Sequence, residues 1–377
     1  MGIVVTMFEG FFLRKRILIT GVAGVKGSWM ASLVMEAGGE VVGLDIRRPE
    51  ADSNFHAAGL ESQIRFVRGD VNDLALVREL LTDADGVFHL AAISLVGEAQ
   101  RDPLETYRTN AQGTASVLEA FRLSERTRYG VFVTTDKVYA PKGGEPWVET
   151  DPLVASGPYP VSKACAEYII ADYHRNYLRA AGKRLGVARA GNVLIGGDFH
   201  SSRRSSGAGR IFVDCVEALL EGRNPEIYAP RYTRPYTYGL DVLAGYMTLM
   251  SRLEEPRVQG EAFNFGPIDG RGVENGYLAD MICQLWGSGV RWHTGTPRDE
   301  PFVDQSLCWD KARERLGWKP VYSLQESLRD TVQWYKEWAN RGRRAGSMRD
   351  FNRELITAHR DAARSQGLRW TGERVIG

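Results

Sequence analysis

Two short segments of this chain carry side chains that could move protons. Tyr159 and Lys163 are four residues apart, so on a helix they share one face. A phenol has an ordinary pKa of about 10, and a neighbouring ammonium group lowers this pKa because it stabilises the phenolate. The pair at this spacing therefore predicts that Tyr159 acts as a base.

The second segment closes a predicted strand, 129–135, and runs from 131 to 137 with the sequence VFVTTDK. It presents hydroxyls from Thr134 and Thr135, the carboxyl of Asp136 and the amine of Lys137. Ligands of open parallel sheets bind at the carboxyl ends of the strands, so we expect these groups to face a ligand. Asp136 and Lys137 taken alone would equally fit a solvated turn or a surface ion pair.

A glycine-rich loop precedes both segments, between a predicted strand and a predicted helix. Gly21 permits a tight turn, Gly24 lets backbone N–H groups approach a pyrophosphate, and Gly27 lets the helix pack on the strand. In this position the loop, with Val25 in it, predicts a dinucleotide site. The alternative is a glycine turn that holds no ligand.

Asp45 ends the second predicted strand and discriminates between the two nicotinamide dinucleotides. It lies 24 positions after Gly21, where a carboxylate suits the free ribose hydroxyls of NAD and repels the 2′-phosphate of NADP. Arg47 and Arg48 follow closely and would suit NADP instead. We expect NAD, whose oxidised nicotinamide would lower the Tyr159 pKa further.

Residues that end the next two predicted strands border the same site. Asp70 and Val71 would edge the adenine. Leu90, Ala91 and Ala92 would leave room for the cofactor, because two of the three side chains are small. Simple packing is the alternative for each of them.

Hydrophobic periodicity places these motifs in an alternation of strands and helices. Strands are predicted at 16–20, 40–46, 64–67, 86–92, 129–135 and 185–190, and helices at 26–37, 74–81, 104–123 and 159–181. Such an alternation implies a parallel sheet covered on both faces. The predicted fold is a Rossmann-type doubly wound α/β sheet with a smaller mixed lobe.

After residue 191 the pattern is less regular. We expect an NAD-binding domain at 1–191, a mixed α/β substrate-binding lobe at 192–340 and a polar C-terminal tail at 341–377, with segments near 237–265 packing back onto the first domain. Residues 196–210 are rich in Gly, Ser and Arg and predict a loop. Further helices are predicted at 211–221, 240–253, 273–286, 311–316 and 324–338, a strand at 262–265, and a docked helix through Met348, Phe351, Leu355 and His359.

The composition excludes several classes of protein. The 377 residues carry 48 basic and 47 acidic side chains, a net charge of +1, so no strong field favours nucleic acid or a membrane surface. The four cysteines form no CxxC pair, which favours reduced cytoplasmic thiols over disulfides and predicts no metal site. No apolar run approaches the ~20 residues of a membrane helix, and we do not read the N-terminus as a signal peptide.

The glycine loop, the Thr-Asp-Lys strand end and the Tyr-x-x-x-Lys helix together resemble the extended short-chain dehydrogenase/reductase superfamily. Within it, the chain is similar to the CDP-glucose 4,6-dehydratases from about Phe8 to Tyr335. The segments that carry this similarity are TGVAGVKGSW at 20–29, HLAAISLVGEAQRDPLETYRTN at 89–110, TTDKVY at 134–139, SKACAE at 162–167, ARAGNVLIGGD at 188–198, FNFGP at 263–267 and KARERLGWKP at 311–320.

The resemblance implies an NAD-dependent lyase that removes water from a nucleoside-diphosphate hexose, with CDP-D-glucose as the best guess. Tyr159 would take the sugar O4 proton while C4 gives a hydride to NAD, and Thr135 would hydrogen-bond O4. Lys163 would hold the nicotinamide ribose. Lys137 would remove the C5 proton, Asp136 would protonate the departing C6 hydroxyl, and the hydride would return to C6.

The same resemblance implies further contacts. Asn110 would belong to the cofactor site, while Ser94, Asn192, Arg210 and Arg234 would contact the substrate, the arginines because a planar guanidinium suits a diphosphate. Asn192 could instead cap a turn. Arg234 could instead stack on a neighbouring tyrosine.

The substrate half departs from the family pattern, mainly in 199–210 and in Arg234-Pro235-Tyr236. Three other functions therefore stay open. They are a UDP-N-acetylhexosamine 4,6-dehydratase, a nucleotide-sugar 4-epimerase, which would not need Asp136 and Lys137, and a non-catalytic NAD or nucleotide sensor. By analogy we expect a cytoplasmic homodimer that pairs through the helices predicted at 104–123 and 159–181.

Overall fold

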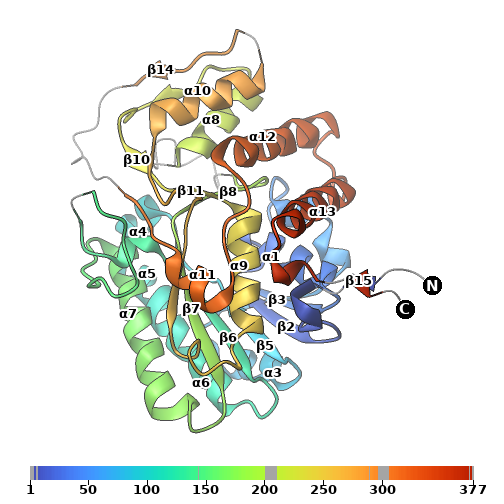
Figure 1. The fold of residues 1–377 in the computed structure, drawn as a ribbon, viewed down its shortest axis with the longest axis vertical. Coiled ribbons are helices and arrows are strands. Elements are labelled where there is room, and N and C mark those ends of the chain that lie inside the picture. Colours follow the sequence, from blue (N-terminus) through green and yellow to red (C-terminus); the bar gives the residue numbers. More distant parts are fainter. Residues whose placement is uncertain are drawn as a thin grey trace.

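Seven parallel strands form the centre of the protein, whose computed structural model describes residues 4–5, 7–142, 144–199, 210–287, 289–295, 305–372 and 374–375. Their order across the sheet is β12-β7-β6-β5-β2-β3-β4 (Figure 1). The strands are β2 Arg16–Thr20, β3 Glu40–Asp45, β4 Arg65–Arg68, β5 Gly86–His89, β6 Tyr129–Val133, β7 Arg184–Ala190 and β12 Ala262–Phe265. The predicted doubly wound sheet is confirmed.

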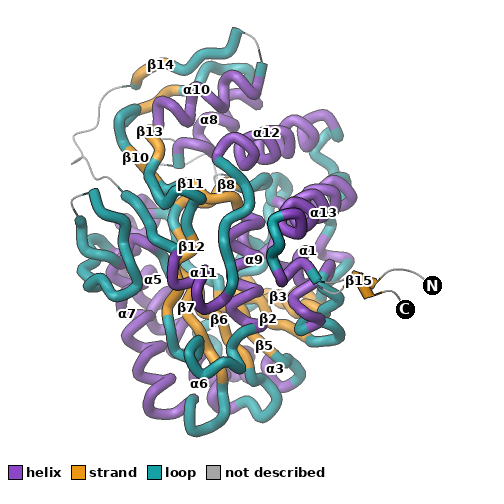
Figure 2. The backbone as a smooth tube through the Cα atoms, in the orientation of Figure 1, coloured by secondary structure: helices purple, strands orange, loops and turns teal. Residues whose placement is uncertain are grey.

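Successive residues of each central strand face opposite layers, which explains their continuous hydrophobicity. In β2, Ile17 and Ile19 pack in one buried cluster and Leu18 in the other. Helices α1 and α9 cover the first face, and α3, α6 and α7 cover the second (Figures 1 and 2). Their bounds are α1 Val25–Glu36, α3 Leu74–Thr82, α6 Gly113–Leu123, α7 Pro158–Tyr173 and α9 Gly239–Ser251.

Two predicted long helices are interrupted by a π-helical segment. The predicted helix at 104–123 consists of α5 Pro103–Tyr107, a π segment at Arg108–Gln112 and α6. Likewise α7 continues into a π segment at His174–Leu178. The periodicity of the apolar residues did not reveal either of these five-residue π segments.

β5 ends at His89, three residues before the end of the predicted strand. The N–H of Ala91 turns away from the ladder and donates to Thr20 Oγ1 at 3.2 Å. Residues 90–95 thereby leave the sheet and become available to line a pocket above the strand ends.

The second half of the chain both returns to the sheet and builds beyond it. β12 adds parallel to β7 at the sheet edge, and α9 packs against β6 and β7. Beyond the strand ends, β8 pairs with β11, β10 with β13 and β9 with β14. These short elements are β8 Asn192–Leu194, α8 Ile211–Leu220, β9 Glu226–Ile227, β10 Thr233–Arg234, β11 Tyr236–Tyr238, β13 Val273–Glu274, α10 Asn275–Trp286, β14 His293–Thr294, α11 Asp310–Leu316 and α12 Leu324–Asn340. The helix predicted at 273–286 thus begins two residues later, after β13.

The predicted tail helix is present as α13 Arg349–Ser365 and packs beside α1 (Figure 1). Asn352 of α13 donates to Asn54 Oδ1 at 2.8 Å and accepts from Trp334 Nε1 at 2.8 Å. His359 contacts Asp241 Oδ1 of α9 at 2.8 Å, fully buried. Through these contacts the tail is part of the folded core.

The remaining elements are short. β1 Val4–Val5 and β15 Arg374–Val375 pair antiparallel, so the two ends of the chain lie side by side (Figure 1). The others are η1 Met7–Gly10, α2 Asn54–Ala57, η2 Leu60–Ser62, α4 Val96–Arg101, η4 Asp136–Val138 and η6 Arg369–Thr371. Among the described residues, no helix is both long and apolar enough to cross a membrane, and no three potential metal ligands cluster.

Candidate active site

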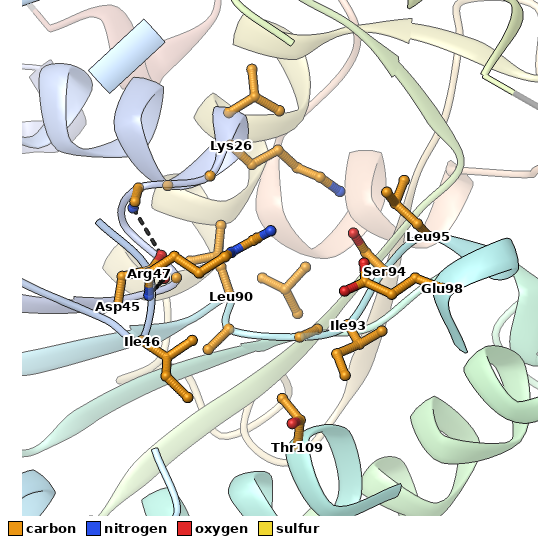
Figure 3. Close-up of a pocket in the computed structure, with 18 of the residues that line it drawn as sticks. Lys26, Asp45, Ile46, Arg47, Leu90, Ile93, Ser94, Leu95, Glu98 and Thr109 are labelled. Atoms are coloured by element: carbon orange, nitrogen blue, oxygen red, sulfur yellow. Dashed lines mark hydrogen bonds between the residues drawn. The ribbon is translucent and has the colours of Figure 1, made fainter. Parts of the chain in front are cut away.

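A pocket runs along the carboxyl ends of β2, β3, β4, β5 and β6 (Figure 3). The glycine loop forms one side, residues 90–95 and 133–134 another, and 197–199 with Arg210 close it from beyond the sheet. Predicted site residues that line it are Gly21, Gly24, Val25, Gly27, Asp45, Asp70, Val71, Leu90, Ala91, Ala92, Ser94, Tyr159, Lys163 and Arg210.

Close packing explains the glycines of the loop. Gly21 has φ +74°, and a Cβ there would lie 2.7 Å from Ala91 N. A Cβ on Gly27 would collide with the backbone of Gly21 and Val22. At Gly24, which lines the pocket, a Cβ would make a single tight contact, with Gly21 O at 3.3 Å.

Asp45 joins the end of β3 to the glycine loop. Its carboxylate accepts from the N–H groups of Ala23 and Arg47, both at 3.0 Å (Figure 3). Burial raises its pKa, and these hydrogen bonds oppose the rise. Arg47 also points into the pocket (Figure 3). The position suits an acceptor for ribose hydroxyls, as expected for NAD.

Asp70 marks the far end of the pocket. Its carboxylate accepts from Asn72 N at 2.9 Å and from Arg108 Nη1 at 2.9 Å. Partial burial acts to raise its pKa, but the hydrogen bonds from Asn72 and Arg108 outweigh burial and lower it. The carboxylate is thus kept ionised at the edge of the pocket.

Asn110 lies behind the pocket wall instead of lining it. Its side chain is fully buried, accepts from Ile93 N at 2.8 Å and donates to Ile93 O and Ser162 Oγ, both at 2.9 Å. All its polar atoms are therefore used within the protein. Asn110 thus fixes the segment after Ala92 against α7, and its expected cofactor contact stays a prediction.

Tyr159 and Lys163 lie on one face of α7, as their spacing predicts, and both are buried beside β6. Burial raises the Tyr159 pKa to about 12, the Asp136 charge raises it further, and a hydrogen bond with Thr135 lowers it. Burial, and then the charge of Lys26, lower the Lys163 pKa to about 7, while Glu167 raises it. The Lys163 ammonium does not lower the Tyr159 pKa in this arrangement; instead Lys163 Nζ donates to Val133 O at 3.0 Å.

Asp136 and Lys137 form a charge pair next to Tyr159. Lys137 Nζ lies 3.4 Å from Asp136 Oδ1, which also accepts from the Thr135 hydroxyl at 3.0 Å. Asp136 is fully buried and Lys137 is one quarter exposed. The surface ion pair that the sequence left open is therefore excluded for Asp136, but Thr135, Asp136 and Lys137 are not among the residues that line the pocket.

A buried network behind β6 holds this end of the sheet. Glu167, one helical turn after Lys163, accepts from Thr134 Oγ1 at 2.6 Å and forms a two-pronged ion pair with Arg189. Arg189 Nη1 also donates to Tyr139 OH at 2.7 Å. The network ties the end of β6, which leads into Thr135, Asp136 and Lys137, to α7 and β7.

The substrate residues inferred by resemblance are dispersed. Arg210 lines the pocket, pairs with Asp198 and donates to Phe199 O at 3.0 Å. Asn192 opens β8, and Arg234 stacks on Tyr232 with its guanidinium 5.6 Å from the ring centroid; neither lines the pocket. Arg234 thus stacks on a neighbouring tyrosine, the arrangement that the sequence left as an alternative. Residues 200–209 of the predicted loop lie outside the described residues.

Among the lining residues that the sequence did not predict are Lys26 and Asp198. Lys26 lies in the glycine loop, at a helix position where only a packing role would be assumed. The sequence signal that could have identified Lys26 as a site residue is its position as a basic residue between Gly24 and Gly27. Asp198 is brought in by Tyr335, whose hydroxyl accepts from Asp198 N at 3.0 Å and donates to Asp198 O at 2.7 Å. No local pattern signals that long-range contact.

Residues 17–266, which span the whole pocket-forming sheet, match the model of the NAD dependent epimerase/dehydratase family. The chain belongs to this family. The residues around the pocket fit NAD, since Gly24 lines it beside the helix N-terminus and Asp45 offers a carboxylate. NAD is accordingly its cofactor.

Individual members of the NAD dependent epimerase/dehydratase family are similar over most of the chain. A CDP-glucose 4,6-dehydratase of Salmonella typhimurium is 30% identical over 88% of this chain and 93% of its own length. The crystal structure of a dTDP-glucose 4,6-dehydratase from Streptomyces venezuelae with NAD bound has a TM-score of 0.73 at 25% identity and covers 87% of this chain and 98% of that one. A UDP-glucose 4-epimerase from Thermotoga maritima has a TM-score of 0.72 at 26% identity, with coverage of 86% and 99%.

Proposed function

We propose that the protein is a nucleotide-sugar 4,6-dehydratase that converts CDP-D-glucose, or a related nucleoside-diphosphate hexose, to the 4-keto-6-deoxy sugar. The observation that carries the proposal is the Asp136–Lys137 pair, in which a fully buried carboxylate accepts from Thr135, the residue that hydrogen-bonds Tyr159 of the pocket wall. An epimerase needs a base at O4 only, whereas water loss also needs a base at C5 and an acid at the C6 hydroxyl. The similarity to dehydratases supports the same choice.

Each of these residues has a role in the proposed reaction that follows from its position. Tyr159 takes the O4 proton, and the Thr135 hydroxyl, already in contact with Tyr159, orients O4. Lys163 holds the nicotinamide ribose from the same face of α7. Bound NAD supplies the hydride acceptor for C4 and the hydride donor for C6. Because the hydride returns, the net reaction is loss of water.

The elimination of water, the middle step of the proposed reaction, involves Asp136 and Lys137 of η4. The 4-ketone makes the C5 proton acidic, and the Lys137 amine removes it. Asp136 delivers a proton to the C6 hydroxyl, which departs as water while the C5–C6 double bond forms. The 3.4 Å contact between the two side chains keeps base and acid next to each other.

The test is mass spectrometry of the purified protein incubated with NAD and, separately, CDP-, UDP-, dTDP- and GDP-glucose. Loss of one water from one of these sugars supports the proposal and identifies the base. Lys137→Ala should stop before water loss. Lys142→Ala is the matched control, since Lys142 pairs with Asp151 outside the pocket and should dehydrate normally.

Conversion without any mass change, detected by NMR as inverted C4, would favour the 4-epimerase. Water loss from UDP-N-acetylglucosamine in a fifth incubation, and from none of the four glucose nucleotides, would favour that class of dehydratase. NAD binding with no turnover of any of these sugars would contradict the proposal and favour a sensor.

We also infer the organisation around the site. Residues 1–191 act as the NAD-binding domain, 192–340 as the substrate-binding lobe and 341–377 as a tail, in a cytoplasmic protein.

Support for a homodimer comes from large apolar side chains exposed along α5–α7, namely Leu104, Tyr107, Leu123, Tyr168 and Tyr177. Sedimentation analysis tests it: Leu104→Asp with Tyr168→Asp should shift a dimer to a monomer.

A further inference from the structure

The tail helix α13 is connected to the NAD pocket, although the reaction proposed above gives it no role. It lies beside α1 and contacts α12 (Figure 1). The match to the NAD dependent epimerase/dehydratase family ends at residue 266, so α13 lies outside the matched residues. Its link to the pocket is a set of buried hydrogen bonds.

Four hydrogen bonds lead from α12 through α13 to the glycine loop. Trp334 Nε1 of α12 donates to Asn352 Oδ1 at 2.8 Å, and Asn352 Nδ2 donates to Asn54 Oδ1 at 2.8 Å. Asn54 Nδ2 donates to Ser28 Oγ at 3.0 Å, and Ser28 Oγ donates to Val25 O at 2.9 Å. All four side chains are buried, and Val25 lines the pocket.

The indole of Trp334 fixes the direction of these bonds. An indole N–H can only donate, so Asn352 turns its amide oxygen toward Trp334 and its NH₂ group toward Asn54. Asn54 accepts with its own amide oxygen, which leaves its NH₂ group for Ser28. The hydroxyl proton of Ser28 is then free to bond the carbonyl of Val25. The orientation of each link therefore depends on the link before it.

Asn54 and Trp334 also hold the segment that closes the pocket from beyond the sheet. The N–H of Asn54 donates to Gly197 O at 3.4 Å, and a Cβ on Gly197 would lie 2.5 Å from Asn54 Cβ. The ring of Trp334 packs so closely on Gly196 that no Cβ would fit there. Gly197 lines the pocket, as does Ser53, which precedes Asn54. Three pocket segments that are far apart in the chain thus meet at these side chains.

We propose that Asn54 and Asn352 are positioning residues of the NAD site, which hold the glycine loop in a fixed place relative to residues 53 and 197. The docked tail helix thereby preorganises the pocket before NAD enters, so less binding free energy is spent on ordering these segments. Neither asparagine lines the pocket, so both act through Ser28 and the backbone. The inference goes beyond the proposed dehydration, because it concerns the cofactor and not the sugar.

The first test compares two apolar substitutions on α13. Asn352→Leu breaks the connection to Asn54, whereas His359→Leu breaks a buried contact with Asp241, which belongs to α9 and does not line the pocket. Each removes a buried polar contact, so both should lower thermal stability. Titration calorimetry of the nucleotide-free protein should show about tenfold weaker NAD binding in Asn352→Leu only. Equal NAD affinities of the two variants would overturn the proposal.

The second test asks whether the two ends of the connection act together. Ser28→Ala removes the link next to the glycine loop and leaves the contacts of α13 in place; because Ala is a good helix former, this variant should fold. It should also weaken NAD binding. The double variant with Asn352→Leu should bind NAD about as well as Asn352→Leu alone, since the connection is already broken. Additive losses, or an unchanged NAD affinity in Ser28→Ala, would contradict the proposal.

Hydrogen exchange in the absence of NAD reports the positioning itself. Asn352→Leu should accelerate amide exchange in peptides that cover 25–28 and 53–57, whereas His359→Leu should accelerate it in peptides of α9. The same exchange pattern in both variants would reduce Asn352 to a general stabilising role. None of these measurements uses a sugar, so the absence of dehydratase activity would refute the proposed function and leave this inference standing.

Discussion

The two sides of the pocket differ in how much of them the sequence reveals. On the NAD side, Gly21, Gly24, Asp45 and Asp70 lie where their motifs predict, lining one pocket. On the substrate side, Asn192 and Arg234 lie outside that pocket and Arg210 is engaged by Asp198. The difference shows that a site formed by the backbone of one short loop can be predicted from the sequence, whereas a site formed by side chains far apart in the chain cannot.

The physical reason is the range of the interactions. The glycine loop is shaped by contacts within a few residues and with the next strand, such as Gly21 against Ala91. The 196–199 segment is instead placed by Tyr335 and by Trp29, whose Nε1 donates to Gly196 O at 2.8 Å. Substitutions on the two sides should therefore have different effects.

The largest expected effect is that of Tyr159→Phe, on the side that the sequence predicts well. Removal of the phenolic base should lower kcat for water loss by about 1000-fold. NAD binding, followed by quenching of tryptophan fluorescence, should change little because the ring stays in place. An activity loss smaller than tenfold would remove Tyr159 from the reaction.

The glycine loop allows a matched pair of substitutions. Gly21→Ala should destabilise the fold by about 1–3 kcal/mol, because φ is +74° and the new Cβ meets Ala91 N at 2.7 Å. Gly24→Ala should cost less stability and weaken NAD binding, because its Cβ would make only one tight contact, with Gly21 O at 3.3 Å, and Gly24 lines the pocket. Urea unfolding and NAD titration separate the two; equal stability losses would contradict this account of the loop.

Lys163 predicts a pH dependence of stability without NAD. Burial, with the charge of Lys26, lowers its pKa to about 7 from 10.5. Between these values the folded chain binds fewer protons than the unfolded chain, so Lys163 makes the free energy of unfolding rise with pH. Urea unfolding of Lys163→Met across this range should show a smaller rise than wild type. An unchanged slope would mean that Lys163 keeps its ordinary pKa when folded.

The smallest effects are expected on the substrate side. Arg210→Ala should raise KM for the sugar about tenfold, as loss of a charged contact to a diphosphate implies. Arg234→Ala removes a partly exposed stack on Tyr232 and should change KM less than about threefold and stability by about 0.5–1 kcal/mol. A larger effect for Arg234 would show that the lobe closes around the substrate and would narrow the contrast between the two sides.

Most elements of the fold could be predicted because each has a local signal. β2 is an apolar run before glycines, and α13 has apolar residues at helical spacing. The predictions missed features that depend on other segments. Examples are the early end of β5, after which Ala91 N–H donates to Thr20 Oγ1, and the hydrogen bonds between Asn110 and Ile93. The pKa of Tyr159 was missed in the same way, because burial by the whole fold raises it.

Local chemistry alone thus specifies the alternation of strands and helices, the dinucleotide loop, and Tyr159 with Lys163 on one helical face. Those features depend on backbone conformation and on spacings of a few residues. Tertiary structure alone brings Lys26 and Lys163 to one pocket and pairs Asp198 with Arg210. Charge balance in a buried site is a sum over segments far apart in the chain, so it exists only once the chain has folded.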